Sequence, residues 1–95
     1  MAGWTKVNIA APVRFSQTVT MDITEVPANS VQEETFDVNG LTVDMVPIVI
    51  KPTRDAGLFI QDWRVSATDT LAVAFRNDTG APINPASQDL IVVIL

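Results

Sequence analysis

Residues 57–95 place the strongest limit on what this chain folds into, because they contain three β-type segments separated by turn residues. In the middle segment, Leu71, Val73 and Phe75 alternate with small or polar residues, and this period of two is typical of a half-buried strand. The chain ends on the apolar run LIVVIL. Such a run predicts a strand with both faces away from water, either central in a sandwich or packed on a neighbouring subunit.

In the first β-type segment of this region, the apolar residues switch from one face of the strand to the other. Leu58 and Ile60 share one parity, whereas Trp63 and Val65 share the other. Either both faces of the strand are partly covered, or a bulge near residues 61–62 restores the register. We favour the bulge.

The earlier part of the chain is also of β type. Residues 17–26 alternate strictly, and β-type sequence resumes at residues 31–38 and at residues 41–50. Pro47 favours an edge or bulged strand in the last of these, because proline cannot donate to a ladder. No helical period of useful length occurs. The pattern predicts an all-β fold, an antiparallel β-sandwich or barrel of about six or seven strands.

Turn-forming residues separate these segments. Asn39 and Gly40 tolerate the positive φ of tight hairpin turns, so a turn of that kind is expected there. In residues 66–69 the Ser and Asp side chains are expected to bond nearby amides, Asn77 to tie down the following loop, and Gly80 to supply positive φ. The predicted structural turn residues are Asn39, Gly40, Ser66, Asp69, Asn77, Gly80, Pro82 and Pro85.

The first sixteen residues are expected to form an extended N-terminal arm, with the β-sandwich domain covering residues 17–95. The arm is rich in apolar side chains, and Pro12 interrupts any regular ladder. It either lies over the domain's own core or docks on another subunit or on a larger assembly, and both possibilities stay open. The predicted partner-contact residues are Trp4, Val7, Ile9, Val13 and Phe15.

Composition excludes several ways of reinforcing a small domain. A chain of 95 residues forms one domain with a thin core. It has no cysteine for a disulfide and no histidine for a zinc or copper site. Self-association is the remaining means of reinforcement.

Composition also limits function. The absence of histidine, cysteine and tyrosine removes the commonest general base and the thiol and imidazole nucleophiles, so an enzyme is not expected and no cofactor is predicted. The formal net charge of -5 opposes binding to nucleic acid. No apolar stretch approaches the ~20 residues of a membrane helix, so no membrane partner is expected. No signal peptide is recognised, which predicts synthesis in the cytoplasm.

The carboxylates have structural explanations. Glu33 and Glu34 are adjacent on a predicted strand and therefore point to opposite faces. Most of the aspartates fall at strand ends and turns, where their side chains bond local backbone amides. A structural cation or a carboxylate-dependent hydrolase remains an alternative, although no EF-hand-like spacing is present.

Carbohydrate binding is a further alternative, because tryptophan side chains offer flat stacking surfaces. Trp4 lies in the arm and Trp63 in a predicted core strand. Each residue is more often a packing residue in such a position.

Residues 64–87, RVSATDTLAVAFRNDTGAPINPAS, followed by the terminal apolar strand, resemble small virion proteins of tailed bacteriophages. The likeness extends over residues 32–95 and includes the upstream FDVNGLTVDMV, with Val43 standing where a turn glycine is usual. The shared features are Gly57, Leu58 and Ile60, a V-S-A-x-D-T turn over residues 65–70, Val73, Phe75 and Asn77 at a strand end, and Thr79, Gly80 and Pro85 in a loop.

This resemblance implies a capsid decoration, or cement, protein. Such a protein sits on the capsid surface of the virion as a homotrimer and binds the major capsid protein. The alternative within the virion is a fibre or tail-associated adhesion module that binds host-surface carbohydrate.

Overall fold

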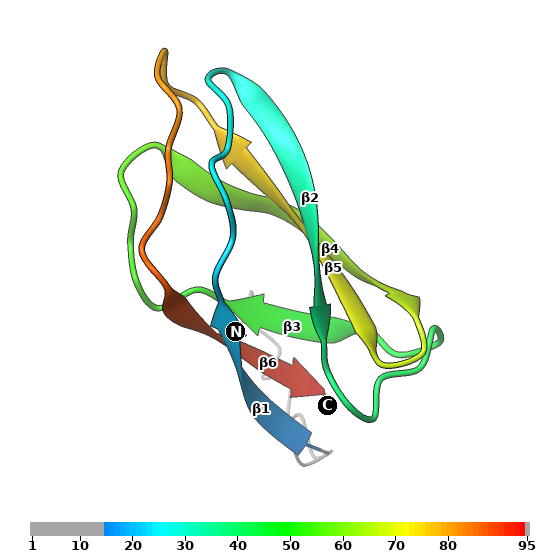
Figure 1. The fold of residues 1–95 in the computed structure, drawn as a ribbon. Coiled ribbons are helices and arrows are strands. Elements are labelled where there is room, and N and C mark those ends of the chain that lie inside the picture. The colour runs from blue at the N-terminus through cyan, green and yellow to red at the C-terminus, as the bar shows by residue number, and fades with distance from the viewer. Residues whose placement is uncertain (1–14, 95) are drawn as a thin grey trace, which may run out of the picture.

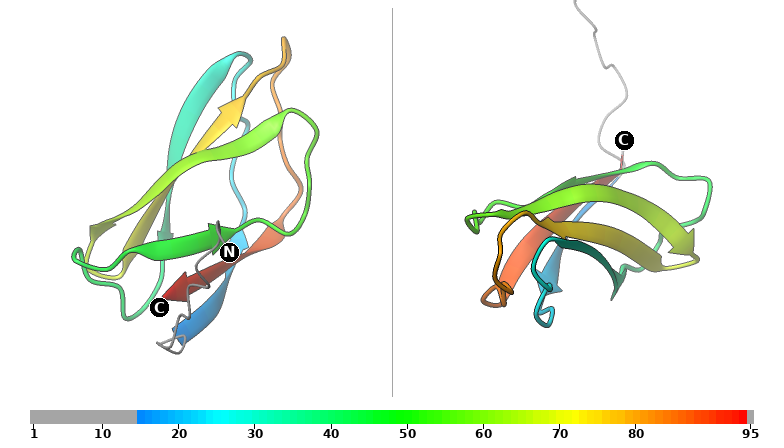
Figure 2. Two further views of the ribbon diagram at one scale, coloured as in Figure 1. Left: turned by 180° about the vertical axis from the view of Figure 1, so that it is seen from behind. Right: turned by 90° about the horizontal axis from the view of Figure 1, so that it is seen from above.

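The computed structural model describes residues 15–94 and contains two three-stranded antiparallel sheets (Figure 1). No helix occurs among these residues. One sheet has the order β1-β6-β3 and the other the order β2-β5-β4. The strands are β1 (Phe15–Met21), β2 (Ser30–Asp37), β3 (Pro47–Ile50), β4 (Leu58–Ala67), β5 (Thr70–Asn77) and β6 (Gln88–Ile94). The predicted all-β class is confirmed, with the two sheets stacked as layers of a sandwich (Figure 2).

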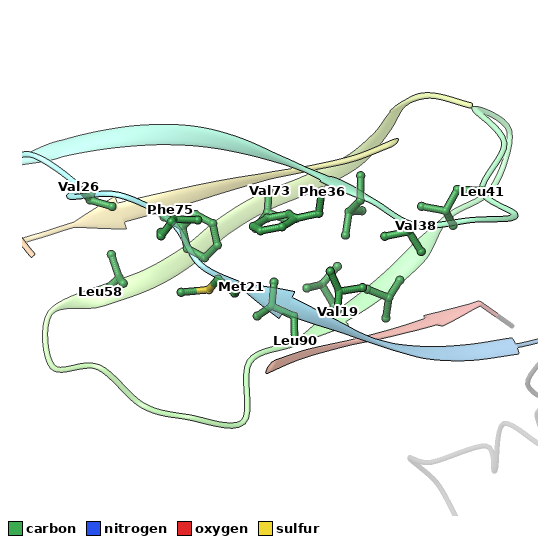
Figure 3. Packing of buried hydrophobic residues seen from close by; sticks show 14 of the residues in the cluster. Val19, Met21, Val26, Phe36, Val38, Leu41, Leu58, Val73, Phe75 and Leu90 are labelled. Carbon is green, nitrogen blue, oxygen red and sulfur yellow. The ribbon is translucent and has the colours of Figure 1, made fainter. Parts of the chain in front are cut away.

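The core lies between the two sheets, where alternate residues of each strand point inward (Figure 3). Leu71, Val73 and Phe75 of β5 are all fully buried, so the alternation predicted for this strand is confirmed. Phe36 of β2 meets Phe75 edge to face, with ring centroids 6.4 Å apart and planes at 81°. This arrangement is favoured by the aromatic quadrupoles.

The places of β3 and β6 in their sheet agree with what the apolar run and Pro47 predicted. The apolar C-terminal segment forms β6, which is the central strand of its sheet. β3 begins at Pro47 and is an edge strand of the same sheet. In β4 the register shifts between Ile60 and Asp62, which confirms the bulge, and shifts again between Val65 and Ala67.

β1 begins at Phe15, so two residues assigned to the arm belong to the first strand. Phe15 packs against the hydrophobic core of its own domain. The other predicted contact residues of the arm, Trp4, Val7, Ile9 and Val13, lie outside the described residues.

The turn at Asn39 and Gly40 is not a hairpin. It leads from β2 in one sheet to β3 in the other, and only Gly40 has positive φ, at 95°. The strand predicted for residues 41–50 is shortened to β3, because residues 41–46 form a further turn in which the Met45 amide donates to the Thr42 carbonyl. The conformation of residues 39–46 therefore follows from the pairing of β2 and β3 in different sheets, and not from the local β propensity of the sequence.

Two predicted turn roles differ in the structure. Gly80 does not have positive φ; Gly57, in the separate connection between β3 and β4, does, at 82°. Gly57 is also the place where a Cβ would collide with the Thr79 methyl group. Ser66 lies within β4, and the carboxylate of Asp69 accepts a hydrogen bond from the distant Gly40 amide at 2.7 Å rather than from a local one.

Asn77, the last residue of β5, ties together the β1–β2 and β5–β6 connections, both of which cross between the two sheets. Its side chain is fully buried, and its Nδ2 donates to the carbonyls of Val26 at 3.0 Å and Ala81 at 2.8 Å. Its Oδ1 accepts from the Thr79 amide and hydroxyl. Val26 and Ile83 form an antiparallel bridge beside it. In the same connection Pro85 is buried and Pro82 is exposed.

Candidate interaction surface

The described carboxylates do not gather into a metal-binding cluster. Residues 15–94 contain no group of three or more side chains suited to holding a metal ion. Glu33 and Glu34 point to opposite sides of β2: Glu33 pairs with Arg64 at 3.0 Å, and Glu34 accepts from Gln32 at 2.6 Å. None of the described segments is a helix long and apolar enough to cross a membrane.

Asp55 is the carboxylate most affected by its surroundings. The Lys51 ammonium donates to it at 2.6 Å and the Gln88 amide at 2.9 Å. The hydrogen bond from Lys51 is the main reason that the pKa of Asp55 is lowered, and it outweighs the opposing effect of burial. This cluster fastens the loop after β3 to the start of β6, which is a structural task.

Trp63 is likewise used inside the fold. Its side chain is half-buried and packs against the core, and its Nε1 donates to the Pro47 carbonyl at 2.7 Å. This bond joins β4 of one sheet to β3 of the other. Of the two tryptophans considered for carbohydrate stacking, Trp63 is thus used within the fold, and Trp4 lies outside the described residues.

Two shallow depressions occur on the described surface. A groove of about 520 Å³ runs between β3 and β4 and is lined mainly by apolar side chains with Lys51 and Arg54 beside them. A second depression, of about 490 Å³, lies over Thr18, Gln88, Asp89 and Ile91. Neither is lined by more than one carboxylate, so neither offers the paired acid and base of hydrolytic catalysis.

The most distinctive surface is the outer side of the β1-β6-β3 sheet. The register places Ile48 beside Val93 and Ile50 beside Ile91, while the intervening residues of β3 and β6 face the core. Ile48 and Ile50 are 40% and 45% exposed. The surface, here called the apolar face, consists of Ile48, Ile50, Ile91 and Val93, bordered on β1 by Ser16, Thr18 and Thr20.

The outer side of the β2-β5-β4 sheet is mixed: most of its side chains are charged or small, but Val31 and Phe59, which lie beside Arg76, are 45% and 51% exposed. Arg64 lies opposite Ala72 and Glu33 opposite Ala74, so their ion pair spans the small side chains of the central strand. Arg76 pairs with Asp78 at 2.6 Å. This surface, here called the charged face, carries the charged side chains of Glu33, Asp37, Asp62, Arg64 and Arg76.

Comparison with models of protein families, with curated proteins and with solved structures finds no match to this chain. The candidate surface therefore rests on its own geometry.

The sequence indicated only part of the apolar face. The arm and the apolar C-terminal run were given as segments that could pack on a partner, whereas Ile48 and Ile50 were not named as contact residues. The signal was nevertheless present, because PIVI and LIVVI are apolar at both parities, so that each strand has an apolar side left over after one side enters the core. Which of those sides stays uncovered depends on the arrangement of the sheets.

Proposed function

We propose that this protein is a bacteriophage capsid decoration protein that attaches to the major capsid protein through the apolar face. The observation that carries the proposal is the exposed apolar surface of Ile48 and Ile50 beside Val93 and Ile91, on a chain with a formal net charge of -5. The virion setting comes from the resemblance of residues 32–95 to small virion proteins of tailed phages. The surface supports a binding role, and the resemblance suggests the partner.

Burial of the apolar face would supply the attachment energy. Each square ångström of apolar surface removed from water contributes roughly 25 cal/mol, before the cost of association is subtracted. A protein that binds only the assembled, expanded shell shifts the assembly equilibrium toward that shell by mass action. No covalent step is required.

Contact of the N-terminal arm with the shell or with a neighbouring copy is part of this proposal. The resemblance also implies a homotrimer, and the oligomeric state is tested separately below. A small core without disulfides fits a protein reinforced by partners. Removal of residues 1–13 is expected to leave a folded domain with weaker attachment. Unchanged attachment would assign the arm to packing on its own domain.

The decisive experiment uses capsids of the encoding phage prepared without this protein. The wild-type chain and two variants, Ile50→Lys and Thr35→Lys, are mixed with the capsids and sedimented. Ile50 lies on the apolar face and Thr35 is exposed on the charged face, so the same lysine is introduced on either side of the sandwich. We expect the wild type and Thr35→Lys to co-sediment, and Ile50→Lys to bind at least about tenfold more weakly, a loss of about 1.4 kcal/mol.

Absence of binding by the wild type would remove the capsid proposal. If the protein were instead retained on immobilised host glycans, the adhesion module would replace it. Equal binding by both lysine variants would keep the capsid but move the contact away from the apolar face.

A further inference from the structure

Within residues 15–94 the sandwich has four edge strands, and each edge has backbone N–H and C=O groups that are not paired within its sheet. β1 and β3 flank β6, while β2 and β4 flank β5. An exposed edge is a template for another strand, and proteins normally guard it with charge, proline, a bulge or shortness. The four edges of this protein differ in that protection.

Three of the edges are guarded. β3 is only four residues long and begins at Pro47, which has no N–H group. β4 is broken by register shifts at two places. β2 carries Glu33 on its outer side and points Glu34 inward, and inward-pointing charge at an edge opposes addition of a strand.

β1 has none of these devices. Its seven residues, FSQTVTM, contain no charged side chain and no proline. They pair with β6 in an unbroken register from Phe15 to Met21. Among the described residues no strand pairs with the other side of β1. It is the edge most open to an added strand.

We propose that β1 binds β1 of a second copy of this chain, antiparallel, about a two-fold axis at Thr18. In this register every residue of the strand has a partner. On the outer side Thr18 meets Thr18 and Ser16 meets Thr20, and Ser and Thr pairs across antiparallel strands are favourable. On the inner side Phe15 meets Met21. No charge is brought against a like charge, although each copy has a formal net charge of -5.

The same register fails on the β2 edge. Two copies of β2 paired antiparallel about its centre would bring Glu33 and Glu34 of one strand against those of the other. Like charges directly opposite one another destabilise a strand pair. The neutral, self-complementary sequence of β1 therefore selects a second copy of β1 as its occupant.

The contact has a geometric consequence for the apolar face. A two-fold axis through a continuous sheet keeps equivalent residues on the same side, so the apolar faces of the two copies would form one wider surface. The contact is isologous and joins copies in pairs. It does not depend on the capsid proposal, and a strict trimer would contradict it.

A single introduced cysteine tests the contact, because the chain has none of its own. Directly opposed residues of antiparallel strands have Cα atoms about 4.5–5.5 Å apart, which lies within the range that a disulfide bridges. We expect Thr18→Cys to form a disulfide-linked dimer in high yield under mild oxidation. Thr35→Cys on the exposed outer side of β2 is the matched control and should cross-link far less.

Light scattering over a range of concentrations provides the second measurement. The wild type is expected to form dimers, and Thr18→Lys, which sets two ammonium groups against each other at the axis, to weaken them at least about tenfold. Thr35→Lys should dimerise like the wild type. Equal cross-linking of the two cysteine variants, a wild type that stays monomeric at millimolar concentration, or a trimer would each overturn the proposal.

Discussion

The two outer faces of the sandwich carry different kinds of side chain. On the charged face, Arg64 and Glu33 lie across a central strand of alanines and keep the sheet in contact with water. On the apolar face, Ile91 and Val93 of the central strand lie beside Ile48 and Ile50. The two sides therefore differ in the number of charged side chains, although Val31 and Phe59 are also exposed on the charged face. This difference is the reason for proposing the apolar face as the contact side, since apolar patches commonly mark interaction sites.

Ion pairs also differ between the two sides. The Lys51 and Asp55 side chains, at the end of the β1-β6-β3 sheet, are 9% and 22% exposed. Those of Arg64 and Glu33 are 59% and 46% exposed. Water screens the second pair more than the first, so the two pairs should contribute unequally to stability.

The largest expected effect on stability is at Asn77, which links the connections between the two sheets. Asn77→Ala removes the donor to the Val26 and Ala81 carbonyls and the acceptor for Thr79, and should lower the free energy of unfolding by about 3 kcal/mol. Thermal and denaturant unfolding followed by circular dichroism measure this change. Asn84→Ala, at an exposed position in the same connection, should change stability by less than about 0.5 kcal/mol. Similar losses for the two variants would contradict the role of Asn77.

A smaller loss of stability is expected at the half-buried ion pair of Lys51 and Asp55. Asp55→Asn should lower the free energy of unfolding by about 1.5 kcal/mol at pH 7, because it weakens the charge-assisted hydrogen bonds from Lys51 and Gln88. The pKa of Asp55 is lowered in the folded state from its ordinary value of 3.8. Its stabilisation is therefore present above pH 3.8 and is lost as the pH falls through the lowered pKa.

The measurement is the free energy of unfolding of the wild type and Asp55→Asn as a function of pH. The two curves should converge in acid. A stability difference at pH 2 as large as that at pH 7 would show that the carboxylate charge is not responsible.

The response of attachment to salt distinguishes the two faces directly. Contact through the apolar face should change capsid affinity by less than about threefold between 0.05 and 0.5 M sodium chloride, because screening acts on charges and not on apolar burial. Sulfate should strengthen it. A steep fall in affinity with sodium chloride would point to the charged face instead.

The smallest effect is expected on the charged face. Glu33→Gln removes the partner of Arg64 at an exposed site and should change the free energy of unfolding by less than about 0.5 kcal/mol. Chemical denaturation alongside Asp55→Asn gives the comparison. A loss equal to that of Asp55→Asn would mean that exposure does not separate the two ion pairs.

The sequence by itself determined the β class and the alternation of β5. It also favoured a bulge in β4, limited β3 to an edge or bulged strand and limited β6 to a central or subunit-covered strand. These follow from side-chain parity, proline and local hydrophobicity, which act over a few residues. It also contained the double-sided apolar character of β3 and β6, without indicating what would cover the second side.

Only the tertiary structure decided which strands share a sheet. It separated β2 from β3, which turned the expected hairpin at Gly40 into a crossing between layers, and it brought Asp69 to the Gly40 amide from far along the chain. It also placed Ile48 and Ile50 of β3 beside Val93 and Ile91 of β6 on the outer side of their sheet, and left β1 as the unguarded edge. Strand pairing of this kind joins residues remote in sequence, so their shared faces and edges exist only once the sheets have assembled.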